Sequence, residues 1–426
     1  MPDVSFKEAF KFWVKLGFIN FGGPAGQIAV MHRELVDRKK WVEESVFLRG
    51  LNFCMLLPGP EAQQLATYIG WRLHGYLGGV VAGMFFVIPS IFVMLALSWL
   101  AAAHGDVPVI AGLFYGISPV VVAIVVEAVM RIGKKSLKHK ALYGFAAGAF
   151  VAGYFLNVPF PLIVLAAAIG GIILGAYYPE IFCLRIKGSK ECSMENTDKQ
   201  TVLPPILQAI KVALVFGILW IAVAAPLVAV FGTDHILTQI TLFFTKAAFV
   251  TFGGAYAVLS YIADYAVNIS GWLTEKQMLS GLGLAESTPG PLIMVTQYVG
   301  FLGAWKFSGN AFQLWTAIAG GLLTTYCTFL PSFMFIFAGA PYIDALSGNR
   351  RIEAALTGVT AAVVGVILKL AVFFSINTFF PGKGPIDGFA VGVAGVTFLA
   401  LQRFHIPIHV VILLGALSGM LWKLYS

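Results

Sequence analysis

Two short motifs rich in glycine and proline each occur twice in the 426-residue chain, and both can expose backbone N–H groups to a ligand. A Gly-Gly pair follows Phe21 and Phe252, and a Pro-Gly-Pro triplet begins at Pro58 and at Pro289. Glycine lets the backbone approach a ligand closely, and proline suits the first turn of a helix. A helix that starts at such a break presents free N–H groups and the positive end of its dipole, which attract anions. The alternative is that these residues only permit close packing, but four breaks in two paired positions favour an anion site.

The predicted binding residues are those of the breaks, the polar side chains beside them and two lysines. Hydroxyl and amide donors suit an oxyanion that must be released again, although each could instead join two helices by a hydrogen bond. A lysine in an apolar segment is a functional candidate, the alternative being that it reaches to the membrane interface. The predicted set is Lys15, Asn20, Gly22, Gly23, Pro58, Gly59, Pro60, Gln63, Gln64, Lys246, Thr251, Gly253, Gly254, Thr288, Pro289, Gly290 and Pro291.

Two acidic residues stand beside the Pro-Gly-Pro triplets without an acidic counterpart in the other copy of the motif. Glu61 follows the first triplet and aligns with Leu292, whereas Glu286 precedes the second and aligns with Met55. A carboxyl group in a poorly solvated site inside a membrane can carry a proton, so both residues are candidates for proton coupling. Glu61 could instead only complement the N-terminus of a helix.

The other residue patterns predict no catalysis, no metal and no cofactor. The four cysteines, Cys54, Cys183, Cys192 and Cys327, lack the spacing of metal ligands, so we expect free thiols. Walker A, His-Glu-x-x-His and Gly-x-Ser-x-Gly motifs are missing from the sequence. The net charge of +8 fits either basic loops that orient a membrane protein or attraction of an anion, and no nucleic-acid partner is predicted.

The composition requires that these residues be positioned by helices inside a membrane. Hydrophobic residues make up 59% of the chain and charged residues 11%, against about 45–50% and 25% in soluble proteins. The mean hydropathy is +0.86. Runs of about 20 apolar residues, long enough to cross a bilayer, include Val80–Ala103, Val107–Met130, Ile206–Phe231 and Leu356–Phe373. We predict an all-α polytopic membrane protein, and we expect no cleavable signal peptide because Met1–Lys15 lacks an apolar core.

The chain is duplicated. From Phe12 to Pro60, 15 of the 49 positions are identical to the residue 231 positions later. The likeness continues at a shift of 242, where Ile88-Pro89-Ser90 matches Leu330-Pro331-Ser332. The predicted domains are a first repeat over 1–180, a polar linker and connecting helix over 181–235, and a second repeat over 236–426.

Each repeat is predicted to open with four short segments and to continue with four full spans. In the first repeat the short segments are Phe6–Phe21, Pro24–Val36, Glu43–Leu56 and Pro60–His74. Segments of 13–16 residues are about 20–24 Å long as helices, less than the roughly 30 Å of the hydrocarbon core. We therefore predict two broken, re-entrant hairpins per repeat, the alternative being tilted and kinked full spans.

Basic residues predict the orientation. Lys and Arg crowd the open ends of the first hairpins and the loop Arg131–Lys140, which places the amino terminus in the cytoplasm. The extra span Ile206–Phe231 then inverts the second repeat and puts the carboxyl terminus outside. Lys246 and Lys276 fall on the outer side in this arrangement, which is against the usual charge bias.

These residues resemble those of the chromate ion transporter family, in its long fused two-domain form. The resemblance covers nearly the whole chain and is carried by Phe21-Gly-Gly-Pro24, by residues 32–36 (HRELV) followed by Trp41, by residues 57–70 (LPGPEAQQLATYIG), by Phe252-Gly-Gly254, and by Ser287-Thr-Pro-Gly-Pro291.

The resemblance implies secondary transport of chromate out of the cell across the inner (cytoplasmic) membrane, with sulfate as a structural analogue. An ion gradient or the membrane potential would drive it, with lipid as a partner and a homodimer among the assemblies open to the chain. Two alternatives remain: an oxyanion channel or uniporter on the same scaffold, and a membrane-embedded enzyme.

Overall fold

The structure is a computed structural model that describes residues 4–21, 23–182, 206–309, 312–343 and 349–425. These residues form helices joined by short loops, and no strand occurs among them, which confirms the predicted all-α architecture. Seven of the described helices are long and apolar enough to cross a membrane. The linker Arg185–Gln200, with Cys183 and Cys192, lies outside the described residues.

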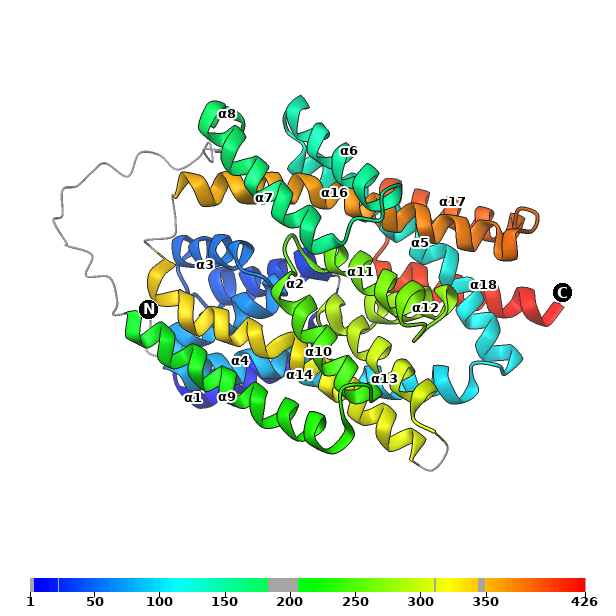
Figure 1. The fold of residues 1–426 in the computed structure, drawn as a ribbon, viewed down its shortest axis with the longest axis horizontal. Coiled ribbons are helices and arrows are strands. Elements are labelled where there is room, and N and C mark those ends of the chain that lie inside the picture. The colour runs from blue at the N-terminus through cyan, green and yellow to red at the C-terminus, as the bar shows by residue number, and fades with distance from the viewer. Residues whose placement is uncertain (1–3, 22, 183–205, 310–311, 344–348, 426) are drawn as a thin grey trace.

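The first half begins with short helices and continues with long ones (Figure 1). Its elements are α1 (Phe6–Ile19), α2 (Gly23–His32), η1 (Arg33–Arg38), α3 (Glu44–Leu56), α4 (Glu61–His104), α5 (Pro108–Ser136), α6 (Lys140–Tyr154), α7 (Phe160–Tyr177) and α8 (Pro179–Phe182). The backbone of α4 is not helical at His74 and Gly75, where φ of Gly75 is 62°. This break coincides with the predicted end of the fourth short segment and separates residues 61–73 from the span that follows.

A single long helix, α9 (Ile206–Phe231), precedes the second half. The second half contains α10 (Ile236–Phe249), α11 (Ala255–Ala263), η2 (Asp264–Ile269), α12 (Glu275–Ser287), η3 (Leu292–Met294), α13 (Val295–Phe307), α14 (Gln313–Gly339), η4 (Ala340–Tyr342), α16 (Arg350–Phe379), η5 (Pro381–Lys383), α17 (Gly388–Phe404) and α18 (Ile408–Tyr425). The bounds of η2 and α12 correspond to those of η1 and α3 at the shift of 231 residues found in the sequence. The positions at which the helices begin and end are therefore repeated as well.

Two of the predicted full spans are shorter than expected. We expected α6 and α17 to cross the membrane, but they have 15 and 17 residues and fall below the length of the seven long apolar helices. At 1.5 Å per residue they are about 23 and 26 Å long. Of the nine predicted full spans, four in each repeat and α9 between them, α6 and α17 are the two that do not reach this length.

The long helices of each half pack against helices of the other half. α5 of the first half packs against α17 and α18 of the second, and α16 of the second packs against α6 and α7 of the first (Figure 1). Glycine permits the closest approaches, because a Cβ at Gly116 of α5 would lie 2.0 Å from the carbonyl oxygen of Gly415 in α18. A Cβ at Gly358, the counterpart of Gly116 in α16, would lie 2.4 Å from the carbonyl oxygen of Ala167 in α7. Small residues bring helix backbones into contact in membrane proteins, so the two halves form one body.

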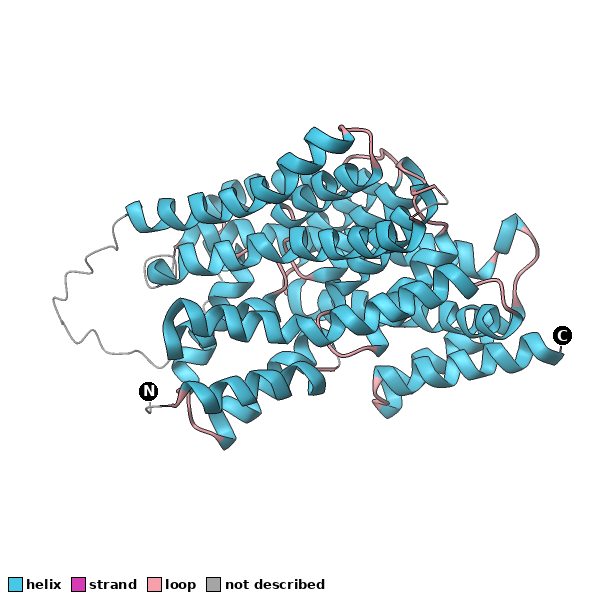
Figure 2. Cartoon of the chain, turned by 90° about the horizontal axis from the view of Figure 1, so that it is seen from below, coloured by secondary structure: helices cyan, strands magenta, loops and turns pink. Residues whose placement is uncertain are grey.

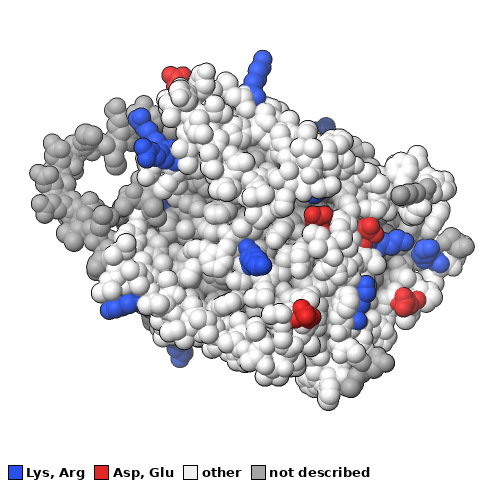
Figure 3. Space-filling model, in the orientation of Figure 1, with Lys and Arg blue, Asp and Glu red and all other residues white. Residues whose placement is uncertain are grey.

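The two ends of the chain lie at opposite ends of the long axis of the bundle (Figures 1 and 2). The long helices run along this axis, and α9 lies on the outside against α10 and α14. Charged side chains are few on the face drawn in Figure 3, and several of them gather towards its right-hand end. An apolar flank between polar ends suits a protein surrounded by lipid.

Candidate functional site

The four helix breaks meet in pairs, and each pair joins the two halves. The backbone N–H of Gly59 donates to the carbonyl oxygen of Thr251 at 2.8 Å, and that of Gly290 donates to the carbonyl oxygen of Asn20 at 2.9 Å. Gly290 is the counterpart of Gly59 in the sequence repeat, and Thr251 is the counterpart of Asn20 at the same shift. The same hydrogen bond is thus made twice, in reciprocal directions.

Only glycine fits at the centre of each Pro-Gly-Pro triplet. Gly59 has φ of +130° and Gly290 has φ of +108°, conformations that other residues rarely adopt. A Cβ at Gly59 would lie 2.5 Å from Oγ of Ser332, and a Cβ at Gly290 would lie 2.6 Å from Cβ of Ser90. Ser90 in α4 and Ser332 in α14 are themselves related by the shift of 242. The glycine of each triplet therefore packs directly against a serine of the opposite half.

We name the two groups by their glycines. The Gly290 cluster consists of Gly290, Asn20, Gln27 and Ser90. The Gly59 cluster consists of Gly59, Gln64, Thr251 and Ser332.

The Gly290 cluster holds buried polar atoms without partners. The Asn20 side chain is fully buried, and neither its amide nitrogen nor its amide oxygen has a hydrogen-bond partner within the described ranges. The same holds there for Oγ of Ser90, which is 1% exposed. Gln27 donates from Nε2 to the carbonyl oxygen of Gly290 at 2.6 Å. Oε1 of Gln27 also has no partner among the described residues. Leaving a buried polar group unpaired costs about 1–3 kcal/mol, so this cluster is suited to a ligand, together with ordered water, that supplies the missing partners.

The Gly59 cluster has more of its groups satisfied. Gln64 donates to the carbonyl oxygen of Pro58 at 2.8 Å, and the Thr251 hydroxyl donates to that of Ala247 at 2.6 Å. Oγ of Ser332 has no partner in the described part of the chain. Gln63, in the first turn of α4, donates to Oγ1 of Thr67 at 3.1 Å.

The two acidic candidates lie in different surroundings. A carboxylate oxygen of Glu61 lies 3.9 Å from the position that a Cβ at Gly254 would occupy, beside the N-terminus of α11 in the opposite half. The described residues give Glu61 no hydrogen bond or ion pair. Glu286 is 5% exposed and accepts a hydrogen bond from the Tyr256 hydroxyl. Glu61 is thus an unpaired carboxylate at a break, whereas Glu286 is held by a tyrosine of α11.

The backbone of the remaining predicted residues agrees with helix breaks. Gly253 and Gly254 have φ of +77° and +91°, and Gly23 has φ of +67°, while Gly22 lies outside the described residues. Pro60 and Pro291 are the N-cap residues of α4 and η3. These helices therefore begin one residue later than the predicted starts at the two prolines. Pro58 is buried and Pro289 is partly exposed.

Three predicted residues are placed differently from the clusters. Lys15 and Lys246 lie on exposed faces of α1 and α10, and Lys246 lines a depression of about 200 Å³ with Thr233 and Gln239. The Thr288 hydroxyl is already engaged by the sulfur of Met94 and the carbonyl oxygen of Ala285. Sequence reasoning missed Gln27, Ser90 and Ser332, although the repeated Pro-Ser pair in α4 and α14 was a signal for the two serines.

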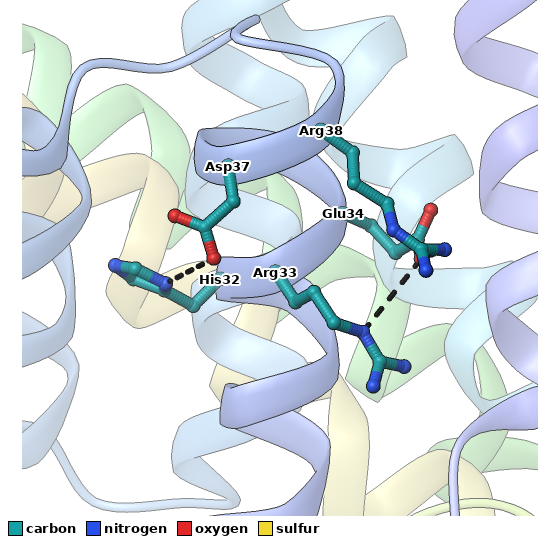
Figure 4. A network of polar contacts seen from close by, with 5 residues as sticks. All are labelled: His32, Arg33, Glu34, Asp37 and Arg38. Atoms are coloured by element: carbon teal, nitrogen blue, oxygen red, sulfur yellow. Dashed lines mark hydrogen bonds and ion pairs between the residues drawn. The ribbon is translucent and has the colours of Figure 1, made fainter.

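A charged network fixes the far end of the first hairpin, on the π-helical turn η1 (Figure 4). Glu34, 8% exposed, is 2.7 Å from the guanidinium of Arg38 and 3.9 Å from that of Arg33, while His32 is 3.5 Å from Asp37. These residues stabilise the open end of the hairpin, away from the breaks.

A family model described as Chromate transporter matches residues 7–172 and again residues 238–420. Over 99% of its length, the chain is 31% identical to a chromate transport protein of Pseudomonas aeruginosa and 25% identical to a probable chromate transport protein of Synechococcus elongatus, covering 93% and 96% of them. It is 28% identical to a chromate transport protein of Cupriavidus metallidurans over 86% of this chain and 82% of that protein. No solved structure matches the chain.

Proposed function

Because the chain belongs to the chromate transporter family, and is a multi-pass membrane transport protein rather than an enzyme, we propose that it exports chromate or a related tetrahedral oxyanion such as sulfate. The proposed route crosses the cytoplasmic membrane by alternating access. The observation that carries this proposal is the reciprocal pair of hydrogen bonds, Gly59 to Thr251 and Gly290 to Asn20.

The reciprocal bonds support a binding site at the contact between two halves that can move against each other. In the proposed scheme the breaks of both halves place glycine surface and neutral side-chain donors around one anion. Neutral groups hold a dianion less tightly than arginines would, which favours release on the other side. The burial of Asn20, Ser90 and Ser332 supports a scheme with a closed state between the two openings.

We propose that the two halves are an inverted repeat with boundaries at 1–180 and 236–426, joined by 181–235. The two matches of the family model fall inside these boundaries. The opposite positions of the chain ends and the single extra helix α9 support the inversion. The basic residues around η1 and in the loop after α5 support a cytoplasmic amino terminus and an outer carboxyl terminus.

Coupling to a proton is part of the proposal, and Glu61 is the better candidate of the two acids. Its carboxylate lies beside Gly254 of the opposite half without a hydrogen-bond or ion-pair partner among the described residues. A change of its contacts between the two openings would change its affinity for a proton, which is what coupling requires. Lys15 and Lys246, exposed on the equivalent helices, would attract the anion along its path.

The test is uptake of labelled chromate and labelled sulfate by proteoliposomes in which the pH difference and the voltage are clamped separately. The proposal predicts saturable flux that a pH difference alone drives. Flux that follows voltage alone and ignores the pH difference would establish a channel or uniporter instead. No flux of either anion would refute the proposed substrate class.

A further inference from the structure

The two clusters occupy equivalent positions but differ in chemistry. Asn20 and Gln27 of the Gly290 cluster are replaced, at the equivalent positions of the second repeat, by Thr251 and Val258. Ser90 and Ser332 are equivalent and equally buried. The Gly290 cluster therefore has two carboxamides, Asn20 and Gln27. The Gly59 cluster has one, Gln64, whose Nε2 already donates to the carbonyl oxygen of Pro58.

The acidic residue beside a triplet belongs to the other glycine, Gly59. Glu61 comes directly after the Gly59 triplet, and its counterpart after the Gly290 triplet is Leu292, which is 2% exposed. An unpaired carboxylate beside the N-terminus of α11 occupies the electrostatic position that an anion would take there. A dianion entering the Gly59 cluster would meet this carboxylate, whereas one entering the Gly290 cluster would meet unpaired donors.

We infer that a single oxyanion binds in the Gly290 cluster, on the amide of Asn20 and the hydroxyl of Ser90, and that Glu61 excludes a second anion from the Gly59 cluster. The inference rests on the proposed function, and it adds which of the two equivalent places takes the substrate. Asn20 offers two N–H donors and Ser90 one O–H donor, a number that suits two or three oxygens of a tetrahedral ion.

The burial of these groups strengthens each hydrogen bond that they donate to the anion. Asn20 and Ser90 are 0% and 1% exposed, so no bulk water competes for their donors. A hydrogen bond to a charged group is about twice as strong as one between neutral groups. Gln27 donates from Nε2 to the carbonyl oxygen of Gly290, so that this oxygen already has a hydrogen-bond partner.

Few titratable groups interact electrostatically with Glu61. The positive charge of Lys135 in α5 acts on Glu61, and Glu61 in turn acts on the thiol of Cys54 in α3. A proton on Glu61 would remove the negative charge from the Gly59 cluster while leaving the donors of the Gly290 cluster unchanged. The division of roles thus separates substrate recognition from the group that carries the coupling proton.

The experiment measures binding of sodium sulfate and sodium chromate to the purified full-length protein by calorimetry, together with thermal unfolding. Wild type is expected to bind one anion per chain. Ser90→Ala is expected to raise Kd about tenfold or more, the effect of losing one hydrogen bond to a charged group. The matched control is Ser98→Ala, because Ser98 lies in the same helix, is fully buried and likewise has no partner for Oγ in the described chain.

Asn20→Leu supplies a second measurement that a purely structural role would not reproduce. Its unliganded melting temperature should be unchanged or higher, because the amide it removes is buried and unpaired, while the rise in melting temperature caused by the anion should disappear. The inference is overturned if two anions bind per chain, if Ser332→Ala weakens binding as much as Ser90→Ala, or if Asn20→Leu keeps the anion-induced rise. If wild type binds neither anion, the proposed function itself fails.

Discussion

The substitution Gly290→Ala tests whether the two halves are joined as the structure describes. Alanine would have to adopt φ near +108°, which costs on the order of 1–3 kcal/mol for a residue other than glycine. Its Cβ would lie 2.6 Å from Cβ and 2.8 Å from Oγ of Ser90, and overpacking of a buried contact costs roughly 1–3 kcal/mol more.

The two contributions together amount to about 2–6 kcal/mol against the closed contact. Even about 2 kcal/mol would lower the population of that contact roughly 30-fold, so transport that passes through it should nearly stop. The assay is oxyanion uptake by proteoliposomes together with thermal unfolding of the detergent-solubilised protein. We expect Gly290→Ala to lower the melting temperature and to abolish most of the flux.

The control and the suppressor make this prediction specific. Gly148→Ala in α6 adds a methyl group to a helix where nothing lies within 4 Å, so it should leave the melting temperature unchanged or slightly raised. Ser90→Gly removes the Cβ that the new methyl group would meet, so the double variant should recover part of the lost stability. A Gly290→Ala protein with wild-type stability and wild-type flux would refute the reasoning.

Three further predictions follow from individual contacts. Tyr256→Phe should lower stability by about 1–3 kcal/mol, seen as a lower melting temperature, because it leaves buried Glu286 without its donor; a variant as stable as wild type would show that the contact is dispensable. Lys15→Ala and Lys246→Ala should weaken oxyanion flux while leaving the melting temperature unchanged, since both side chains are exposed, and unchanged kinetics in the double variant would return them to an interfacial role. Glu61→Gln should abolish pH-driven export and preserve anion exchange at fixed pH, whereas full pH-driven export in Glu61→Gln and Glu286→Gln would leave the membrane potential as the driving force.

The sequence predicted the features that depend on local chain chemistry. The apolar runs predicted the helical membrane fold, and the Gly-Gly and Pro-Gly-Pro motifs predicted where helices are interrupted. The predicted short segment Pro60–His74 ends at the observed break at His74 and Gly75. These features follow from backbone preferences of glycine and proline, which act over a few residues.

The sequence did not predict which breaks would meet. The Gly290 bond to Asn20 joins residues 270 positions apart, and the pairing of Gln27 with Gly290 depends on how one hairpin enters the other half. The lengths of α6 and α17 were also missed, since apolar composition does not fix where a helix ends. The bond of Tyr256 to Glu286 could not be foreseen, because Tyr256 aligns with Ala25 and has no counterpart in the first half.

The most direct test of the central claim, that both halves build one central oxyanion site from their helix breaks, is to locate bound chromate. Anomalous scattering from chromium in a crystal of the wild-type protein grown with chromate gives the ion's position without reference to any mutation. The account predicts one chromium atom between the halves, beside Gly290 and within hydrogen-bonding reach of the Asn20 amide and the Ser90 hydroxyl. A chromium atom bound instead beside Lys15 or in the depression lined by Lys246, with the helix breaks unoccupied, would contradict it.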